Sequence, residues 1–200
     1  MGRTQSFERD AVVRTARDLF WDRGYDLASL SDLEAATGLN RSSLYNAFGS
    51  KRGLFDAAVQ DYLTTVIRPR LAVLRRGSPD ASPLLDYFAT LSHDVATLSD
   101  DSPRRGCLLI NCAAGLSGHD DPTRTLVEGY RAELAAALRF ALVTAGLGTE
   151  ADAAALDSRV RTLASLSVSA MLLSRVNRDE AVALLDTAGA HITAWAAHRV

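Results

Sequence analysis

The sequence predicts an all-α protein of about nine helices, and three observations support this fold class. The chain has 200 residues, of which 48% are hydrophobic and 23% charged, a balance typical of a globular protein with a real core. Ala and Leu, both strong helix formers, are its dominant residues. Apolar residues recur at spacings of three and four, and no strand-like alternation persists between turn signals. We expect a small N-terminal domain over residues 1–52 and a larger helical domain over residues 53–200.

The composition excludes several classes of protein. With 22 Lys and Arg against 24 Asp and Glu, the net charge of −2 argues against a chain that coats nucleic acid by bulk attraction, although a local basic face remains open. Cys107 and Cys112 are too few for a disulfide framework and lack the His partners of a zinc site. The apolar runs are far shorter than the roughly 20 residues of a membrane span, and the N-terminus has no apolar signal core. We therefore expect a cytoplasmic protein without metal, cofactor or membrane contact.

The first predicted helix runs from Ser6 to Arg23. Its apolar face repeats at spacings of three and four through Val12, Ala16, Leu19 and Phe20. Gly24 is expected to end this helix.

A second helix is predicted to begin at Ser29 and to end at Gly38. Ser29 can cap the free amides of the first turn, and Asp32, three residues on, completes a capping box. The corner at residues 37–40 turns the chain into a third helix at about residues 41–48. Two short helices joined by a tight glycine turn are typical of a helix-turn-helix.

The third helix is expected to turn a polar face outward. Leu44 and Phe48, four residues apart, should face the core, which leaves the polar residues around them exposed. Arg, Asn, Ser and Tyr are residue types that bond to bases or phosphates of DNA. Ser50 then caps the next helix, and Lys51 and Arg52 place positive charge beside its first amides, which suits a phosphate clamp.

This stretch resembles the TetR family of transcriptional regulators. The resemblance covers about the first quarter of the chain, through RDLFWDRGYD, SLSDLEAATGL and LYNAFGSKRGLF, in which Tyr45, Phe48 and Lys51 match the family's most characteristic triplet. It implies that Tyr45 and Lys51 contact the DNA backbone, and that the outward side chains of residues 40–46 meet bases or phosphates. The candidate DNA-binding residues are Ser29, Asn40, Arg41, Ser42, Ser43, Tyr45, Asn46 and Lys51.

Glu34 departs from the family pattern. The family, and helix-turn-helix units generally, prefer a small residue at this position because the two helices approach closely there. Glu34 must therefore bend outward or find a basic partner, for which Arg41 is the candidate.

Beyond Arg52 the apolar spacing predicts six further helices. The fourth helix continues from Arg52 through Val66, where Pro69 either interrupts or kinks it, or the helix simply ends near residues 76–77. In the resembling family the equivalent helix carries the ligand signal to the reading heads. The other five helices are expected at about residues 84–98, 105–116, 122–146, 151–174 and 178–198.

The last two helices carry the predicted dimer interface. Their apolar stripes repeat at coiled-coil-like spacing and are rich in small residues, which permits close helix approach, although each stripe could instead pack within its own subunit. Because a palindrome is best bound by a twofold dimer, and the resembling family dimerises through its last two long helices, we favour a four-helix interface. The candidates are Leu156, Val160, Leu163, Ser167, Ala170, Val182, Leu185, Ile192 and Trp195.

A ligand pocket is predicted between the central helices, mostly apolar with a few polar groups to orient a ligand. The candidates, most of which would equally form an ordinary core, are Phe88, Ser92, Cys107, Leu108, Asn111, Tyr130, Leu134 and Met171. Asn111 needs a partner if it is buried. His93 and His119 are expected in loops or at the surface rather than on a metal.

Cys107 supports two interpretations. Arg104, Arg105 and a helix start adjoin it, and these would lower its pKa and favour a thiolate that senses oxidants or electrophiles. The alternative, which we favour, is a small residue buried in a tightly packed helix.

These expectations together predict a ligand-responsive repressor rather than an enzyme. It binds a palindromic operator in double-stranded DNA as a homodimer and is released by an unknown small-molecule effector. The sequence contains no phosphate loop, dinucleotide fingerprint or HExxH motif. The alternatives are a transcriptional activator with the same DNA-binding head, a thiol-based repressor controlled by Cys107, and a helical interaction module without DNA binding.

Overall fold

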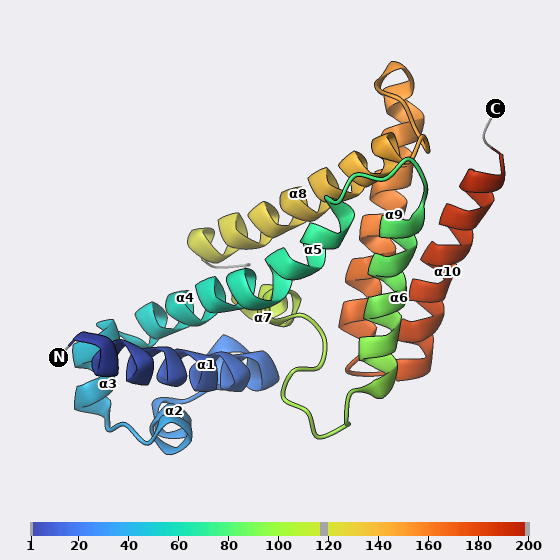
Figure 1. Ribbon diagram of the computed structural model, residues 1–200. Coiled ribbons are helices and arrows are strands. Elements are labelled where there is room, and N and C mark those ends of the chain that lie inside the picture. The colour runs from blue at the N-terminus through green and yellow to red at the C-terminus, as the bar shows by residue number, and fades with distance from the viewer. Residues whose placement is uncertain (1, 117–119, 199–200) are drawn as a thin grey trace.

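The computed structural model describes residues 2–116 and 120–198, with side chains at 9–112 and 120–198. These residues form helices and no strand, which confirms the predicted all-α class (Figure 1). Because α4, η1 and α5 follow one another without a break, and η2 runs directly into α9, the described chain has nine separate helices, the number predicted. The elements are α1 (Gly2–Leu27), α2 (Leu30–Thr37), α3 (Arg41–Phe48), α4 (Lys51–Tyr62), η1 (Leu63–Ile67), α5 (Arg68–Leu74), α6 (Ser82–Thr97), α7 (Leu108–Leu116), α8 (Asp121–Thr144), η2 (Glu150–Asp152), α9 (Ala153–Leu173) and α10 (Arg178–Ala197).

Helices α1, α2 and α3 form a small unit at one end of the molecule, which we call the head (Figure 1). Ala16 and Phe20 of α1 are fully buried in it, and the Phe20 ring meets the Phe55 ring of α4 edge-on with 5.2 Å between centroids. Gly24, at φ 75° and ψ 170°, is not helical and kinks the chain, so the first helix of α1 ends there as predicted and a short second helical segment follows it to Leu27.

The long helix that leaves the head contains one π turn. The amide of Arg68 donates to the carbonyl of Leu63, five residues earlier, at the end of η1. Pro69 then lies in the first turn of α5, where its missing amide hydrogen is tolerated. Pro69 therefore coincides with a change of helix type and does not end the helix, which continues to Leu74.

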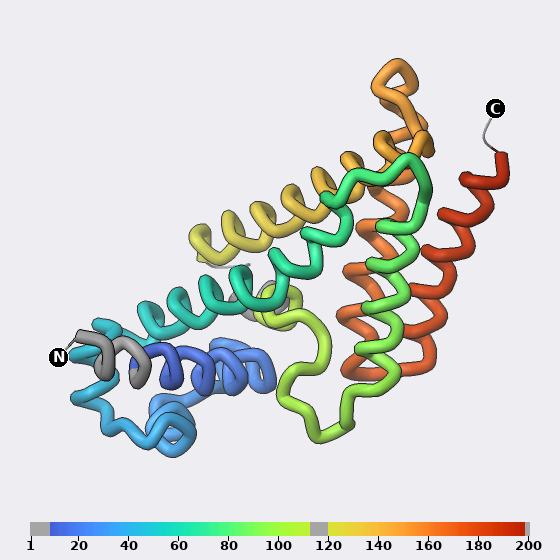
Figure 2. The backbone as a smooth tube through the Cα atoms, in the orientation of Figure 1, coloured from blue at the N-terminus to red at the C-terminus, as the bar shows by residue number. Residues whose placement is uncertain are grey.

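Helices α5 to α10 form the larger unit, which we call the body. Helices α6, α9 and α10 stand side by side, and α8 packs against α5 and α9 (Figure 2). The core of the body includes the fully buried Leu84, Leu163 and Ile192. Helix α7 contacts both α1 and α8 and so joins head to body. The division between residues 52 and 53 stays a prediction. None of the described helices combines the length and apolarity that crossing a membrane would require.

Candidate nucleic-acid interface and adjoining pocket

The start of α2 is held by the predicted capping box. The amide of Asp32 donates to Oγ of Ser29 at 3.1 Å, and the amide of Ser29 donates to Oδ2 of Asp32 at 3.0 Å. Hydrogen bonds from Ser29 lower the pKa of the Asp32 carboxyl, so the acid stays charged. Ser29 remains exposed at the surface of the head while its hydroxyl fixes where α2 begins.

The corner between α2 and α3 depends on a glycine and a second cap. Gly38 lies at φ 70°, in the left-handed region, and its amide donates to the carbonyl of Glu34 at 3.0 Å. Asn40 caps α3, because its Oδ1 accepts from the amide of Ser43 at 2.9 Å. Two short helices thus meet through a corner that holds α3 in one orientation.

Helix α3 presents the polar face that its sequence predicts. Leu44 is buried at 4% exposure and Phe48 is half-buried, with the guanidinium of Arg9 4.9 Å from the Phe48 ring centre. The residues that α3 leaves exposed or half-buried on its outer side are Arg41, Ser42, Ser43, Tyr45 and Asn46. A helix with one buried face and such an outer face can enter the major groove of DNA.

Glu34 is accommodated through Arg41, the predicted partner, but not through its guanidinium. Oε1 of Glu34 accepts a hydrogen bond from the backbone amide of Arg41 at 2.5 Å, at the first residue of α3. A carboxylate there stabilises the positive end of the helix dipole. The guanidinium of Arg41 stays at the surface.

The two basic residues at the start of α4 have separate roles. Lys51 is half-buried with Nζ 4.4 Å from the ring centre of Tyr25, and this burial lowers the pKa of its ammonium group. Arg52 forms ion pairs at 2.7 Å with Asp56 and with Asp120, the cap of α8. Arg52 therefore ties α4 to α8, and a phosphate clamp made by both residues stays a prediction.

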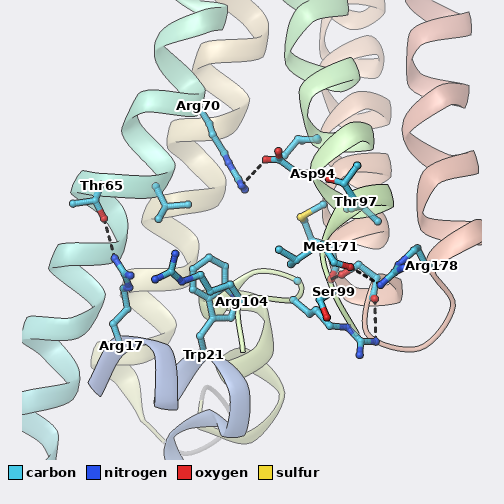
Figure 3. A pocket seen from close by; sticks show the side chains of 17 residues that line it. Arg17, Trp21, Thr65, Arg70, Asp94, Thr97, Ser99, Arg104, Met171 and Arg178 are labelled. Atoms are coloured by element: carbon cyan, nitrogen blue, oxygen red, sulfur yellow. Dashed lines mark hydrogen bonds and ion pairs between the residues drawn. The ribbon is translucent and has the colours of Figure 1, made fainter. Parts of the chain in front are cut away.

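A cavity of about 500 Å³ lies where the head meets the body. Figure 3 shows Arg17 and Trp21 rising from α1 on one side, with Arg70 and Asp94 paired across the opening and Met171 opposite. Its lining comes from α1, η1, α5, α6, α9, α10 and the loop between α6 and α7. The lining residues are Arg17, Trp21, Thr65, Val66, Arg70, Leu91, Asp94, Val95, Thr97, Leu98, Ser99, Arg104, Arg105, Gly106, Met171, Ser174 and Arg178.

Carboxylates neutralise several arginines of this cavity. Asp18 bonds to both Arg17, at 2.9 Å, and Arg104, at 2.8 Å, and the buried Arg17 also reaches Asp61 at 2.7 Å. The pKa of Arg104 is raised by its hydrogen bond to Asp18. These contacts connect α1 of the head to α4 and to the loop before α7.

The cavity is not where most of the predicted pocket residues lie. Met171 lines it, and Met171 also lines, with Cys107 and Tyr130, a space of only about 10 Å³. The central helices pack too closely to leave room between them, so Phe88, Leu108 and Leu134 are core residues at 1% exposure or less.

The two polar residues predicted for the pocket bond elsewhere. Ser92 donates to Asp186 on α10 at 3.0 Å, in an exposed position. Asn111 is half-buried, and its Nδ2 donates to the carbonyls of Trp21 and Arg105, each at 3.2 Å, so its amide has partners within the chain.

Both cysteines are buried, and neither forms a disulfide within the described residues. Burial raises the pKa of the Cys107 thiol, whose Sγ accepts from the hydroxyl of Tyr62 at 3.2 Å, and it raises the pKa of Cys112 to about 11. The neighbouring Arg104 and Arg105 direct their charges elsewhere, to Asp18 and to backbone carbonyls. This environment favours the packing interpretation of Cys107 over the thiolate sensor.

No group of three or more metal-binding side chains occurs within residues 9–112 and 120–198. His93 is exposed, and His119 lies outside the described residues.

Most of the predicted dimer stripe is buried inside one chain. Val182 and Trp195 are half-buried, and Trp195 stacks on His191 with 5.6 Å between ring centres. Leu172 and Val176, at 52% and 82% exposure, are apolar residues that the stripe did not include. The buried members, each at 7% exposure or less because they pack on their own subunit, are Leu156, Val160, Leu163, Ser167, Ala170, Leu185 and Ile192.

Comparisons with known proteins agree with this geometry. The profile of the family described as "Bacterial regulatory proteins, tetR family" matches residues 12–58. The HTH-type transcriptional repressor ComR of Escherichia coli (strain K12) is 38% identical over 117 residues, which are 58% of this chain and 54% of ComR, so the match spans about half of that relative. The uncharacterized HTH-type transcriptional regulator YezE of Bacillus subtilis (strain 168) is 31% identical over 145 residues, 72% of this chain and 73% of YezE.

A solved structure shares both fold and sequence. A cysteine-substituted form of the TetR family transcriptional regulator CifR, complexed with 26-bp double-strand operator DNA, is 30% identical and has a TM-score of 0.74. The match covers 91% of this chain and 95% of that chain.

Proposed function

The chain belongs to the TetR family of transcriptional regulators, which are not enzymes, and we propose that it is a cytoplasmic repressor that binds a palindromic operator as a homodimer and is released by a small-molecule effector. The observation that carries the proposal is α3, a capped helix whose Leu44 is buried while Arg41, Tyr45 and Asn46 stay exposed.

The exposed residues of the head would have different roles in DNA binding. Arg41 has the donors that recognise guanine, and Asn46 has the donor and acceptor that recognise adenine, whereas Tyr45 and Lys51 suit phosphate oxygens. Ser29, Asn40 and Ser43 would act by fixing the ends of α2 and α3, and the exposed Ser42 would reach the duplex directly.

We expect a dimer because a protein with twofold symmetry can bind both half-sites of a palindrome, which lie about one helical turn apart. The exposed Leu172 and Val176 of the α9 end support a subunit contact that lies beside the predicted stripe rather than on it. The effector would occupy the cavity between head and body. A difference of about 1 to 3 kcal/mol in its affinity for two head positions would weaken operator binding about 5- to 150-fold.

Selection of bound sequences from random DNA tests the proposal, followed by dissociation constants for the selected duplex. Arg41→Ala should weaken binding by about 1 to 3 kcal/mol and relax specificity at one base pair, whereas Lys51→Ala should weaken binding of all sequences and reduce the salt slope by about 1. Arg76→Ala is the control, because Arg76 is 64% exposed just beyond α5, far from α3. Failure to select any sequence, or unchanged affinity in both head variants, would favour an interaction module without DNA binding.

The activator alternative needs a separate experiment. Deleting the gene should raise expression from a reporter that carries the selected operator, because a repressor has been removed. Loss of expression instead would identify an activator with the same head.

A further inference from the structure

Two residues that line the 500 Å³ cavity, Trp21 and Arg105, each carry a buried N–H group, Nε1 and Nε, that has no acceptor within the described residues. Trp21 is only 3% exposed. A buried donor without a partner costs about 1 to 3 kcal/mol, so such groups usually face an acceptor. Both residues line one cavity, so a molecule bound in it would lie next to both side chains.

The guanidinium of Arg105 also has no carboxylate partner within the described residues. Its two terminal nitrogens donate to the backbone carbonyls of Asp100, Ser174 and Arg175, at 2.8 to 3.4 Å, which hold the side chain but carry no negative charge. The other cavity arginines contact carboxylates, namely those of Asp18 and Asp61 for Arg17, Asp18 for Arg104, Asp94 for Arg70 and Asp100 for Arg178. Within the described chain, Arg105 is the cavity arginine bonded to carbonyls alone, so its half-buried charge is the one available to an anion bound in the cavity.

The rest of the lining is apolar enough to hold a hydrocarbon body. Leu91, Val95 and Leu98 of α6 and its end, with Val66 and Met171, supply aliphatic surface, and Figure 3 shows Met171 across the opening from Trp21. A volume of about 500 Å³ falls within the range of small-molecule sites.

We propose that this cavity binds a small amphipathic anion, whose carboxylate or phosphate oxygens accept the N–H groups of Trp21 and Arg105 and whose apolar part lies on Leu91, Val95 and Met171. Trp21 belongs to α1 of the head, and Arg105 belongs to the loop before α7. A ligand bound to both residues therefore connects the head directly to that loop. The effect of this ligand on the position of the head on DNA rests on the proposed function. The binding of the ligand itself does not.

Calorimetry on the free, full-length protein tests the binding step with three probes of equal chain length: octanoate, octyl phosphate and 1-octanol. At least one anion should bind at least about tenfold more tightly than the alcohol, because a hydrogen bond to a charged group contributes about 1.5 to 3 kcal/mol. Tight binding of octanoate alone identifies a carboxylate ligand, and tight binding of octyl phosphate alone a phosphate ester.

Two variants locate the anion. Trp21→Phe deletes one N–H and keeps an aromatic ring, and Arg105→Gln removes the charge; each should weaken binding of the preferred anion about tenfold. Arg76→Gln, an exposed arginine outside the cavity, should leave it unchanged. Because Arg105→Gln also removes bonds to carbonyls, thermal melts must show that each variant is folded, and Trp21→Phe keeps the test valid if Arg105→Gln unfolds.

Equal binding of octanol and the anions, no binding of any probe, or full affinity in a folded Trp21→Phe protein would overturn the proposal. The measurement contains no DNA, so a chain that fails to bind DNA leaves its result intact. If both proposals hold, adding the preferred anion should raise the operator dissociation constant, and operator DNA should weaken anion binding by the same factor.

Discussion

Gly106, in the loop between α6 and α7, approaches α9 more closely than any side chain would permit. Its φ is +76°, and a Cβ added there would lie 2.8 Å from the carbonyl oxygen of Met171 and 3.1 Å from Oδ1 of Asn111. The left-handed backbone costs a residue with a Cβ about 1 to 2 kcal/mol. Overpacking against a backbone oxygen that cannot rotate away costs about 1 to 3 kcal/mol more. Gly106→Ala should therefore lower the free energy of unfolding by about 2 to 5 kcal/mol.

Urea unfolding at one fixed protein concentration, followed by far-UV circular dichroism, measures this loss, and two other glycines separate its causes. Gly38 has a φ of +70° but nothing within 4 Å of an added Cβ, so Gly38→Ala should lose only about 1 to 2 kcal/mol. Gly129, inside α8, has neither constraint, and Gly129→Ala should gain up to about 1 kcal/mol. If Gly106→Ala loses no more than Gly38→Ala, close approach to α9 does not determine the loop.

Three further outcomes follow from contacts described above. Glu34→Ala should lower the free energy of unfolding by about 1 kcal/mol, measured by urea unfolding, because it removes the acceptor for the Arg41 amide; no loss would show that water replaces it. The pKa of the Asp120 carboxyl is lowered from 3.8 to about 2, mainly by Thr123 and then by Arg52. The charged carboxylate therefore stabilises the fold fully above about pH 4, and this contribution is lost as the pH falls toward 2. In acid titrations, Asp120→Asn should make the free energy of unfolding depend less steeply on pH between 2 and 4, and an unchanged slope would contradict the assignment. Cys107 should react with iodoacetamide far more slowly in the folded protein than in urea, as mass spectrometry of the alkylated peptide would report, and rapid labelling of the native chain would restore the sensor interpretation.

Local signals explain what could be predicted of the head. The capping box at Ser29, the left-handed turn at Gly38 and the burial of Leu44 each depend on residues within one or two helical turns, and all three occur as expected. Arg41 could be predicted as the partner of Glu34 for the same reason. The hydrogen bond to the backbone amide of Arg41 could not be predicted, because opposite charges in a sequence indicate a contact between side chains rather than with backbone groups.

The cavity and the subunit contacts of the body depend on residues that are far apart in the sequence. The spacing of apolar residues along the chain does not indicate such contacts. Trp21 and Arg105 share a cavity only because α7 and its preceding loop fold back on α1. Helical periodicity likewise identifies Leu163 and Leu185 as buried but does not say whether their own chain or a second copy covers them. Arg104 and Arg105 precede Cys107 in sequence, yet tertiary bonds carry their charges away from the thiol.

The π turn of η1 gives the long helix two differently oriented faces. One additional residue in a turn advances the following side chains by about 100° relative to a regular helix. Before this turn α4 packs on α1, and after it α5 packs on α6 and α8, so each half is matched to a different neighbour. Both halves belong to one continuous helix, so a twist of α5 about its axis would be passed to α4 if the helix moves as one body. In the proposed dimer, motion in the body would then reach α1 as a rotation of the head, and this rotation would change how two heads fit one duplex.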